Sequence, residues 1–419
     1  MKTRNAPALA APLAAALSIG CGGTDNHQSN PSSEAIERRV TQQAAPDPPS
    51  AIVDKRGRSW VRGRAVVYAP DRLPGGQLPQ RPPQSGEEEE RKLAAMADEE
   101  LAEKLSPRSM YAGYEYSLEK PSIEGARQFR DYLARKARGE RGPEARGKGW
   151  SLGSAGGTPG NEVSEPLGSE ATHANELPIV IGADNRQQAS HTTFPWRTML
   201  FITDSNWFPG STGQHAGCTA QLVGPSFAMS VAHCFAPDDE SWYSTRNWAP
   251  GVDSQATNPA PYGYWNGCYW VTIPSSYTGA GGYYDFAVIE FSDMYPTCNL
   301  YPGDTVGSLN WWSGFVPDGN EVGYVYGYPG IGCPGSATCN KPQIWGIGST
   351  GMDEDGDNID HYADTTEGES GAGLYVIDGN RYVVGSHQYW YSHPLDEWNE
   401  ARRLEGLFFN YLIDYTAAE

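Results

Sequence analysis

Residues 230–234 of this 419-residue chain read Ser230-Val231-Ala232-His233-Cys234 and close an apolar stretch that begins at Cys218. Residues 368–373 read Gly368-Glu369-Ser370-Gly371-Ala372-Gly373, a serine between flexible glycines. A serine hydroxyl is a poor nucleophile unless a neighbouring base accepts its proton and a third group orients that base. Asp285, which opens another apolar run, supplies the third group. Together these positions predict a catalytic triad of His233, Asp285 and Ser370.

The turn around Ser370 also predicts an oxyanion hole. The backbone N–H groups of Gly368 and Ser370 can point together there and stabilise a charged intermediate. A GxSxG pattern also occurs at the nucleophile of α/β-hydrolases, but that site requires a strand–turn–helix and the chain order Ser, Asp, His. The order in this chain is His, Asp, Ser, which excludes the α/β-hydrolase arrangement.

The sequence around these motifs is typical of an all-β protein. Short apolar or aromatic runs alternate with clusters of Gly, Pro, Asn and Asp, which is the pattern of an antiparallel sandwich or barrel. The runs are residues 198–202, 218–222, 286–291, 322–326, 374–377 and 382–385. Residues 399–415 carry apolar side chains at helical spacing and predict a closing amphipathic helix.

Charge divides the chain near residue 177. Residues 1–176 hold 24 Lys or Arg and 24 Asp or Glu, whereas residues 177–419 hold seven and 27. The net charge of −20 therefore lies in the second part. Such a field repels nucleic acid and anionic lipid, so we expect no nucleic-acid partner. The contrast also predicts a boundary between separately folded units.

The N-terminus is typical of an export signal. Lys2 and Arg4 precede a run of small and apolar residues, 6–19, that is too short to span a bilayer. Residues 1–20 are therefore predicted to be a signal peptide. Residues 17–21 also resemble a bacterial lipobox with Cys21 as the lipidated residue, and an ordinary signal peptide with an incidental cysteine is the alternative. We expect an exported bacterial protein, either secreted or held at the outer surface as a lipoprotein.

The other six cysteines lie in the acidic part, and an even set in one exported domain predicts disulfides. No pair shows the CxxC spacing of a zinc site. Spacing favours the pairs Cys218–Cys234, Cys268–Cys298 and Cys333–Cys339.

The region between the signal and the acidic part reads as a tether followed by helices. Residues 22–81 are rich in Pro, Ser, Gln and Arg and predict a flexible segment. Residues 87–105 and 122–137 predict two helices whose narrow apolar stripes dock onto another surface. Residues 139–175 predict a linker.

Further motifs in a fixed order resemble the chymotrypsin-like serine protease superfamily, and within it the bacterial glutamyl endopeptidases of the V8-like and Bacillus type. The motifs are Val180 to Arg186 with Thr192 to Arg197, the histidine block, Tyr284-Asp285-Phe286, Gly327-Tyr328-Pro329-Gly330, Asp364-Thr365-Thr366 and Val384-Gly385-Ser386-His387. This resemblance covers nearly all of residues 179–415. It implies two antiparallel Greek-key β-barrels with the triad in the cleft between them, in a protease domain of residues 177–419.

The resemblance also implies a zymogen. Residues 21–176 would then form a propeptide that is removed, and its neutral helices would pair with the acidic protease domain. A disordered stalk from a lipid anchor is the alternative. The expected partners are peptide or protein substrates and the chain's own propeptide, and no cofactor is required.

Specificity is ambiguous in the sequence. By resemblance, Thr365 and His387 line the pocket for the residue before the cut bond, where they would bind a Glu carboxylate. Glu367, near the pocket entrance, would repel a carboxylate. Asp364 lies six residues before Ser370, the position at which trypsin-like enzymes bind Arg or Lys. We expect cleavage after Glu, with cleavage after Arg or Lys as the alternative.

Glu369 differs from the Asn or Gln of close relatives and is similar to the acid of trypsin-like zymogens. In those proteins the acid pairs with the freed N-terminal amine and orders the pocket. We therefore expect Glu369 to accept an amine generated between residues 177 and 181.

Residues 353–360 alternate carboxylates, which makes Asp353, Asp355 and Asp357 candidate ligands for a structural calcium ion. The glycine comes at the fourth position of the stretch instead of the sixth, and an acidic hairpin turn is the favoured interpretation. Two other functions are compatible with the sequence, a non-catalytic protease-like surface protein and a serine esterase. The intact triad favours the endopeptidase.

Overall fold

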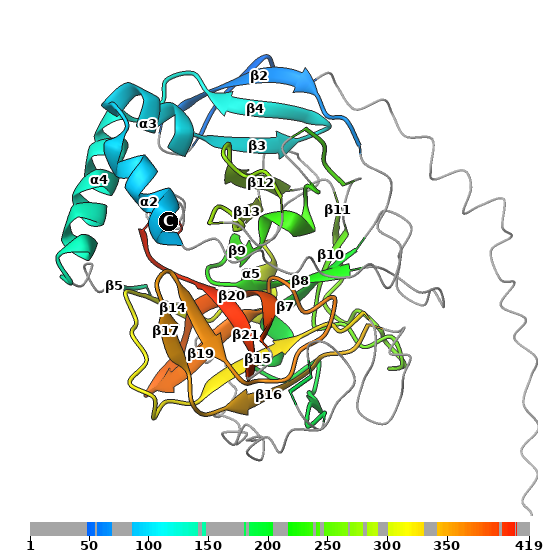
Figure 1. Ribbon diagram of the computed structural model, residues 1–419. Coiled ribbons are helices and arrows are strands. Elements are labelled where there is room, and N and C mark those ends of the chain that lie inside the picture. Colours follow the sequence, from blue (N-terminus) through cyan, green and yellow to red (C-terminus); the bar gives the residue numbers. More distant parts are fainter. Residues whose placement is uncertain are drawn as a thin grey trace, which may run out of the picture. The chain divides into compact units, whose positions relative to one another are not determined.

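The apolar runs of the sequence form the strands of two β-sheets in the computed structural model (Figure 1). The structure describes residues 48–54, 57–68, 86–140, 145–147, 180–181, 184–203, 217–237, 240–243, 247–266, 269–279, 283–291, 301–330, 342–393, 396–406 and 408. Five of the six predicted runs coincide with a strand to within one residue at each end, and the sixth, residues 382–385, lies inside the longer strand that ends at His393. The predicted all-β class with two antiparallel sheets is confirmed.

The first sheet carries the histidine and aspartate motifs. Its strand order is β1-β2-β4-β3-β12-β13-β9-β8-β7-β10-β11. The strands are β1 (Ala51–Val53), β2 (Ser59–Ala65), β3 (Pro107–Tyr111), β4 (Tyr114–Leu118), β7 (Met199–Thr203), β8 (Gly217–Leu222), β9 (Phe227–Ser230), β10 (Asn247–Pro250), β11 (Trp265–Asn266), β12 (Tyr269–Pro274) and β13 (Ala287–Phe291).

The second sheet carries the residues that flank the serine. Its order is β17-β18-β21-β20-β19-β15-β16-β6, and β14 pairs in parallel with β20 and antiparallel with β5. The strands are β5 (Ala145–Gly147), β6 (Gln187–Gln188), β14 (Asn310–Ser313), β15 (Gly323–Gly327), β16 (Trp345–Ser349), β17 (Asp353–Asp355), β18 (Asn358–His361), β19 (Gly373–Asp378), β20 (Asn380–His393) and β21 (Asp396–Arg403).

Helices are few. The α-helices are α2 (Gly86–Ala95), α3 (Asp98–Leu105), α4 (Ile123–Ala137) and α5 (Pro302–Val306), and two 3₁₀ turns are η1 (Trp196–Thr198) and η2 (Ala232–Cys234). The helix predicted over 87–105 is divided at Ala97, where the acidic residues that follow favour the first turn of a second helix. Ser122 caps α4 by accepting the N–H of Gly125 at 2.9 Å.

The predicted closing helix was wrong at its start. Residues 399–403 belong to β21, because this segment pairs on both sides, with β18 and with β20. Such two-sided pairing outweighs the helical spacing of the apolar residues. Gly406 and Phe408 are helical, and residues 409–415 lie outside the described part of the chain.

The tether predicted over residues 22–81 contains strands in its described part. β2 pairs with β4, and β4 pairs with β3. β3 then pairs with β12 through four residue pairs, from Met110 opposite Val271 to Pro107 opposite Pro274. One sheet therefore contains strands from both sides of residue 177, and residues 49–419 form one compact unit.

An aromatic cluster joins the two parts of this sheet. Trp270 of β12 is buried against Trp60, Tyr111 and Tyr116, with ring centroids 5.2–5.4 Å apart. The hydroxyls of Ser109 and Thr272 lie 2.7 Å apart across the strand pair. Strand addition thus covers the edge of β12 with apolar surface and ladder hydrogen bonds.

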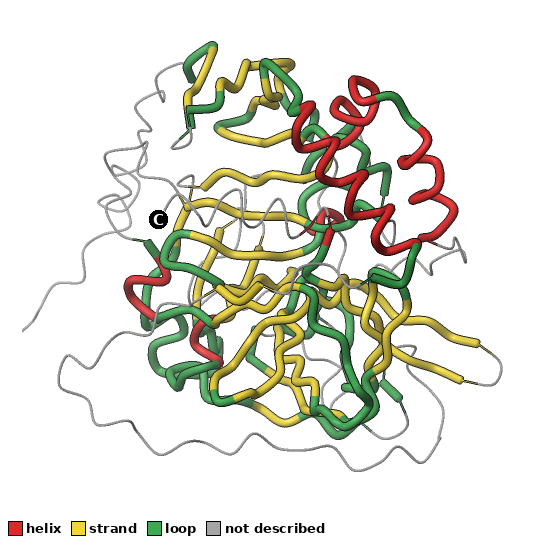
Figure 2. The backbone as a smooth tube through the Cα atoms, turned by 90° about the vertical axis from the view of Figure 1, so that its left-hand side faces the viewer, coloured by secondary structure: helices red, strands yellow, loops and turns green. Residues whose placement is uncertain are grey.

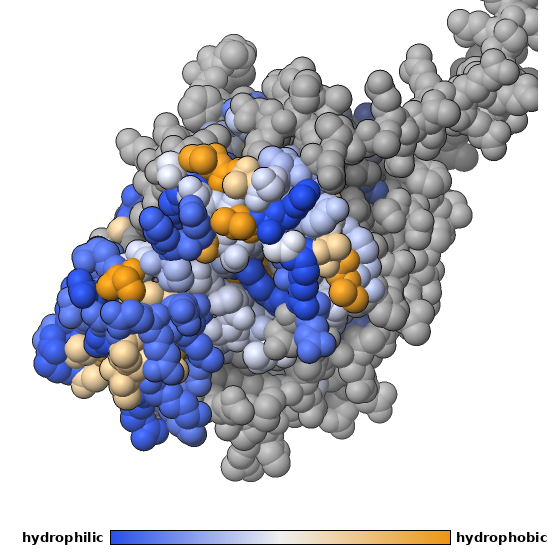
Figure 3. Space-filling view, turned by 90° about the horizontal axis from the view of Figure 1, so that it is seen from above, coloured by the Kyte–Doolittle hydropathy of each residue, from blue (hydrophilic) through white to orange (hydrophobic). Residues whose placement is uncertain are grey.

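The three N-terminal helices gather at one side of the sheets (Figures 1 and 2), and they dock through charged groups. Lys136 of α4 lies 2.6 Å from Asp357 and 2.8 Å from Glu90 of α2. The hydroxyl of Tyr132 donates to Glu405 at 2.6 Å. Seen from above, the exposed faces in this region are mostly polar, with small and separate apolar patches (Figure 3).

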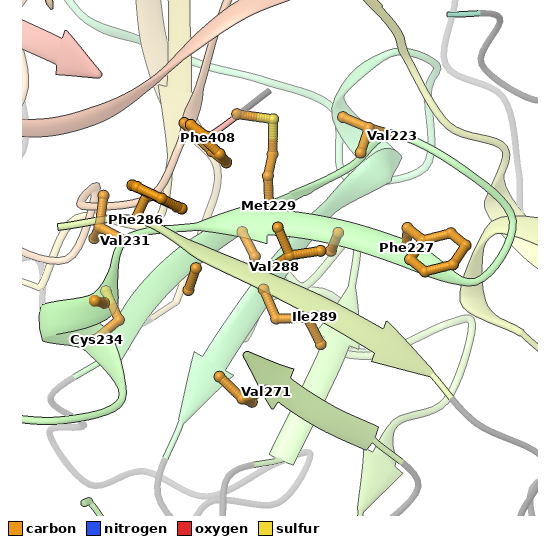
Figure 4. Close-up of a cluster of buried hydrophobic side chains, with 14 of the residues drawn as sticks. Val223, Phe227, Met229, Val231, Cys234, Val271, Phe286, Val288, Ile289 and Phe408 are labelled. Carbon is orange, nitrogen blue, oxygen red and sulfur yellow. The ribbon is translucent and has the colours of Figure 1, made fainter. Parts of the chain in front are cut away.

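The core under the histidine motif consists of side chains from β9, β12 and β13. Figure 4 shows Met229, Val288 and Ile289 projecting from β9 and β13, and Phe286 and Phe408 beside them. The rings of Phe286 and Phe408 are stacked, with their centroids 4.7 Å apart. These residues are almost fully buried, and close packing of this kind fixes the positions of the strand ends.

Several sequence predictions fall outside the described residues. These are the signal peptide of residues 1–20, the lipidation of Cys21, and the disulfides Cys268–Cys298 and Cys333–Cys339. Among the residues that are described, no helix is both long and apolar enough to cross a bilayer.

The docking of α2 and α4 predicts a pH dependence. Burial and neighbouring Asp357 raise the pKa of Glu90 to about 8, against the opposing effect of Lys136. A carboxyl whose pKa is higher in the folded state than in the unfolded chain loses stability as pH rises between the two values. We expect the wild-type unfolding temperature to fall between pH 5 and 8, and the fall to be about 2–4 °C smaller in Glu90→Gln.

Thermal melts across this pH range measure the effect. Glu88→Gln, on the exposed face of the same helix, is the control and should retain the wild-type slope. Equal slopes for Glu90→Gln and wild type would contradict the prediction.

Candidate active site

His233 and Asp285 lie at adjacent ends of paired strands. Ser230 of β9 stands opposite Ala287 of β13, so the residues just beyond them face each other. Asp285 Oδ2 lies 2.8 Å from His233 Nδ1, and Asp285 Oδ1 accepts the backbone N–H of His233 at 2.9 Å. Both side chains are buried. The aspartate thus fixes the ring orientation and directs the second ring nitrogen, Nε2, away from itself.

Ser370 is held beside this pair by its own backbone. Its carbonyl oxygen accepts the N–H of Thr219 at 2.9 Å and lies 3.6 Å from Cys234 Sγ. Cys234 follows His233 directly and forms the predicted disulfide with Cys218, which precedes Thr219. The serine hydroxyl is buried and has no hydrogen-bond partner within the described part of the chain. It is therefore available for a base or a substrate.

The turn before Ser370 exposes two N–H groups for an acceptor. Thr366 N donates to Glu369 Oε2, Glu369 N to Thr366 O, and Gly371 N to His387 O. By contrast, the N–H groups of Gly368 and Ser370 have no acceptor among the described residues. Buried backbone donors are rarely left in this state. The pair forms an arrangement that can bind a developing oxyanion.

Glycine is required at two positions of this turn. Gly368 has a φ of +94°, and a Cβ there would lie 2.4 Å from the carbonyl oxygen of Tyr328. Gly371 has a φ of +86°, and its Cβ would lie 2.0 Å from Ser230 Oγ. The Gly-x-Ser-Gly spacing of residues 368–371 therefore reflects backbone geometry that other residues cannot adopt without strain.

Thr219 supports the turn and was missed from the sequence. Its hydroxyl donates to the carbonyl of Gly368 at 2.9 Å and accepts the N–H of Tyr328 at 2.9 Å. This holds the Gly368–Glu369 peptide, which lies between the two peptides that carry the N–H groups of Gly368 and Ser370. The only sequence clue was the position of Thr219 next to Cys218.

Two of the predicted pocket residues, Thr365 and His387, are buried. Thr365 Oγ1 makes no hydrogen bond with any residue that the structure describes, and the ring nitrogens of His387 have no partner in normal hydrogen-bond geometry there, although the backbone of Glu400 lies near enough to influence the ring. The backbone of His387 is hydrogen-bonded to Gly371 and Ala372, so His387 lies close to Ser370. Burial and nearby His233 lower the pKa of His387 to about 3, so the ring is neutral. A neutral imidazole still donates one N–H.

His361 lies against His387 at a ring-centroid distance of 5.4 Å. It is also buried, and burial lowers its pKa well below the usual range. The contact between these two histidines could not be predicted from the sequence, because β21 separates their strands in the sheet.

Asp364 and Glu369 contact the segment before β6. Asp364 accepts the backbone N–H groups of Ile181 and Asn185, each at 2.9 Å. Glu369 is paired with the guanidinium of Arg186 at 2.8 Å. The sequence predicted a pocket position for Asp364 and an N-terminal amine for Glu369, and Arg186 was missed. Isolated charges are expensive to bury, so a buried acid at 369 could have prompted a search for a cation.

The remaining predicted residues are less constrained. Glu367 is half-buried, and its carbonyl accepts the N–H of Gly330 at 2.5 Å. The acidic stretch forms the β17–β18 hairpin. Asp353 is the first residue of β17, and Asp355 is its last residue, next to the turn. Asp357 faces Lys136 and Arg402. Among the described residues, no three His, Cys, Asp or Glu side chains are arranged to hold a metal ion.

Comparisons with known proteins return structural similarities alone. No family model and no curated protein matches the sequence. The chain is similar to a solved Glu endopeptidase in complex with MPD, at 22% identity and a TM-score of 0.45, over 57% of this chain and 100% of the other. It is also similar to the protease Anisep from Arthrobacter nicotinovorans, at 16% identity and a TM-score of 0.41, over 56% and 100% of the two chains. A third similarity is to the thermostable serine protease AL20 from an extremophilic microorganism, at 14% identity and a TM-score of 0.37, over 52% and 96%.

The support from Thr219 generates a testable prediction. Thr219→Val preserves shape but leaves the buried carbonyl of Gly368 and the N–H of Tyr328 without partners, which should cost about 1–3 kcal/mol of unfolding free energy. Reaction of Ser370 with a fluorophosphonate should slow by about 10- to 100-fold, because the Gly368 N–H is no longer held in direction.

Denaturant unfolding and labelling kinetics measure the two effects. Thr203→Val is the matched control, since this buried threonine on neighbouring β7 has no hydroxyl partner among the described residues. If Thr219→Val behaved like Thr203→Val, the hydroxyl would have no role in holding the turn.

Proposed function

We propose that this protein is a serine endopeptidase that hydrolyses peptide bonds through an acyl-enzyme on Ser370. The observation that carries the proposal is the buried His233–Asp285 pair beside a buried serine and two N–H groups without acceptors. These groups supply a base, its orienting acid, a nucleophile and an oxyanion hole.

Each group has a defined part in the reaction. His233 accepts the proton of Ser370 as the hydroxyl oxygen bonds to the substrate carbonyl carbon. The N–H groups of Gly368 and Ser370 bind the oxygen that becomes negative. His233 then passes the proton to the leaving amine as the C–N bond breaks. Water attacks the acyl-enzyme with the same base, and Ser370 is regenerated.

The pocket chemistry favours cleavage after Glu. Thr365 and His387 offer hydroxyl and imidazole donors that have no other partner among the described residues, and a buried carboxylate requires such donors. A bound carboxylate would also raise the pKa of His387 and favour its charged form. The alternative, cleavage after Arg or Lys, needs an acid in the pocket. Both oxygens of Asp364 are instead occupied by backbone donors.

We further propose that the protein is made as an exported zymogen that is cleaved between residues 176 and 181. The evidence for export is the N-terminal sequence and the disulfide Cys218–Cys234. The non-catalytic alternative is disfavoured because no catalytic group is missing. An esterase would be distinguished by ester hydrolysis without peptide hydrolysis.

Fluorophosphonate labelling followed by peptide mapping tests the catalytic proposal. We expect labelling at Ser370 in processed wild type, none in processed Ser370→Ala, and a loss of about 10⁴-fold in peptide hydrolysis for processed Asp285→Asn. Ser313→Ala, a buried serine on β14, should label normally after the same processing. Correctly folded, processed wild type that neither labels nor cleaves peptides would support the non-catalytic alternative.

Peptides that differ only in the residue before the cut bond test the specificity. We expect Glu to be preferred over Gln and Arg. Thr365→Val should lower the rate for the Glu peptide by about 10- to 100-fold, the loss for one hydrogen bond to a buried charge, and should affect the Gln peptide less. A preference for Arg that Asp364→Asn removes would instead identify an Arg- or Lys-cleaving enzyme.

A further inference from the structure

Arg186 is buried beside the turn that presents Ser370. Its Nη1 donates to Glu369 Oε2 at 2.8 Å and to Thr366 Oγ1 at 2.7 Å. Its Nε and Nη2 donate to the two oxygens of Asp184 at 3.0 and 2.8 Å. Two hydrogen bonds of the guanidinium therefore join the segment before β6 to the turn before the serine, and two more hold the guanidinium to Asp184 within its own segment.

The same Glu369 oxygen closes that turn. Oε2 accepts the N–H of Thr366 at 2.5 Å, and the N–H of Glu369 donates back to the carbonyl of Thr366 at 3.1 Å. Gly368 lies inside this closed loop, and Ser370 follows it. The position of the Glu369 carboxylate thus sets the directions of both N–H groups of the oxyanion hole.

We propose that Arg186 is a positioning residue that holds the oxyanion-hole turn from within the chain, so that the turn needs no N-terminal amine. The inference rests on the proposed endopeptidase function. It replaces the expectation that Glu369 pairs with an amine released between residues 177 and 181.

Charge balance around Glu369 supports this role. Burial raises the pKa of the Glu369 carboxyl to about 7, while Arg186 and the Thr366 N–H lower it. The other acids at this place are Asp184, which faces the guanidinium, and Asp364, which faces Ile181 and Asn185. Without Arg186, the carboxyl of Glu369 would be buried beside two further acids, with no cation among its described neighbours to offset its charge, and it would take up a proton.

The segment that precedes Arg186 is held at the site by a different acid, Asp364. The backbone N–H of Ile181 already donates to Asp364 at 2.9 Å, and Ile181 is buried. A terminus created just before Ile181 would therefore place its amine against Asp364, while Glu369 stays with Arg186.

Substitution of the pair tests the proposal. We expect Arg186→Gln to slow fluorophosphonate labelling of Ser370 by about 100-fold, with partial recovery in Arg186→Lys. The labelling rate of the double variant Arg186→Gln/Glu369→Gln should fall no further than that of the slower single variant, because the effects of residues that act as a unit are not additive. The acid limb of the pH–rate profile should move to higher pH in Arg186→Gln, because the pKa of Glu369 rises when the cation is removed.

The matched control is Arg403→Gln. Arg403 is equally buried and paired, with Glu354 and Glu405, but lies outside this turn. This variant should lose stability and keep the wild-type labelling rate and pH profile. If Arg403→Gln slowed the labelling of Ser370 as much as Arg186→Gln, the effect of Arg186 would be one on overall stability alone, and the proposal would be overturned.

A second experiment needs no variant. Selective acetylation of the α-amino group of processed wild-type protein, verified by mass spectrometry, should leave labelling and peptide hydrolysis unchanged. Loss of both activities on acetylation would overturn the proposal even if Arg186→Gln failed to fold. Wild type that never labels would count against the proposed function, whereas labelling that is insensitive to Arg186→Gln would count against this inference alone.

Discussion

The antiparallel pairing of β9 with β13 is the constraint on which the rest of the site depends. Its register places the 3₁₀ turn that carries His233 against the residues that precede β13, and so brings Asp285 to the histidine ring. A shift of one residue would exchange the faces of the sheet to which Val288 and Ile289 point, and because both faces of β13 are buried it would disrupt the packing on both. Catalytic geometry and core packing are therefore satisfied by one and the same register.

The geometry around Ser370 depends instead on hydrogen bonds, because nearly all buried polar groups in a folded protein have a hydrogen-bond partner. Around the turn, Thr219 and His387 pair with backbone groups, and Arg186 pairs with the side chains of Thr366 and Glu369. The polar groups that stay without a partner among the described residues include the Ser370 hydroxyl, the Thr365 hydroxyl and the His387 ring. Buried groups of this kind are costly unless a ligand pairs with them, so the exceptions mark where a substrate is expected to bind.

The sequence predicted the strands and the three motifs well, because alternation, glycine spacing and motif order are local properties. It failed where the outcome depends on partners far away in the chain. Residues 399–403 have a helical pattern and became a strand because β18 and β20 lie on both sides. Residues 51–65 have the composition of a tether and became strands because β4 offered an edge. Arg186 could not be assigned to Glu369, since 183 residues separate them and neither flanking sequence is distinctive.

The addition of β3 to β12 has a consequence for the quaternary state of a processed protein. The contacts made by β3, the Trp270 cluster and Lys136 all lie between residues 49–147 and the part of the chain after residue 180. A cut in the intervening segment would sever the covalent connection and leave this ladder and its buried rings in place. The N-terminal fragment would then persist as a noncovalent light chain in one-to-one stoichiometry, and its departure would expose a bare strand edge that is prone to self-association.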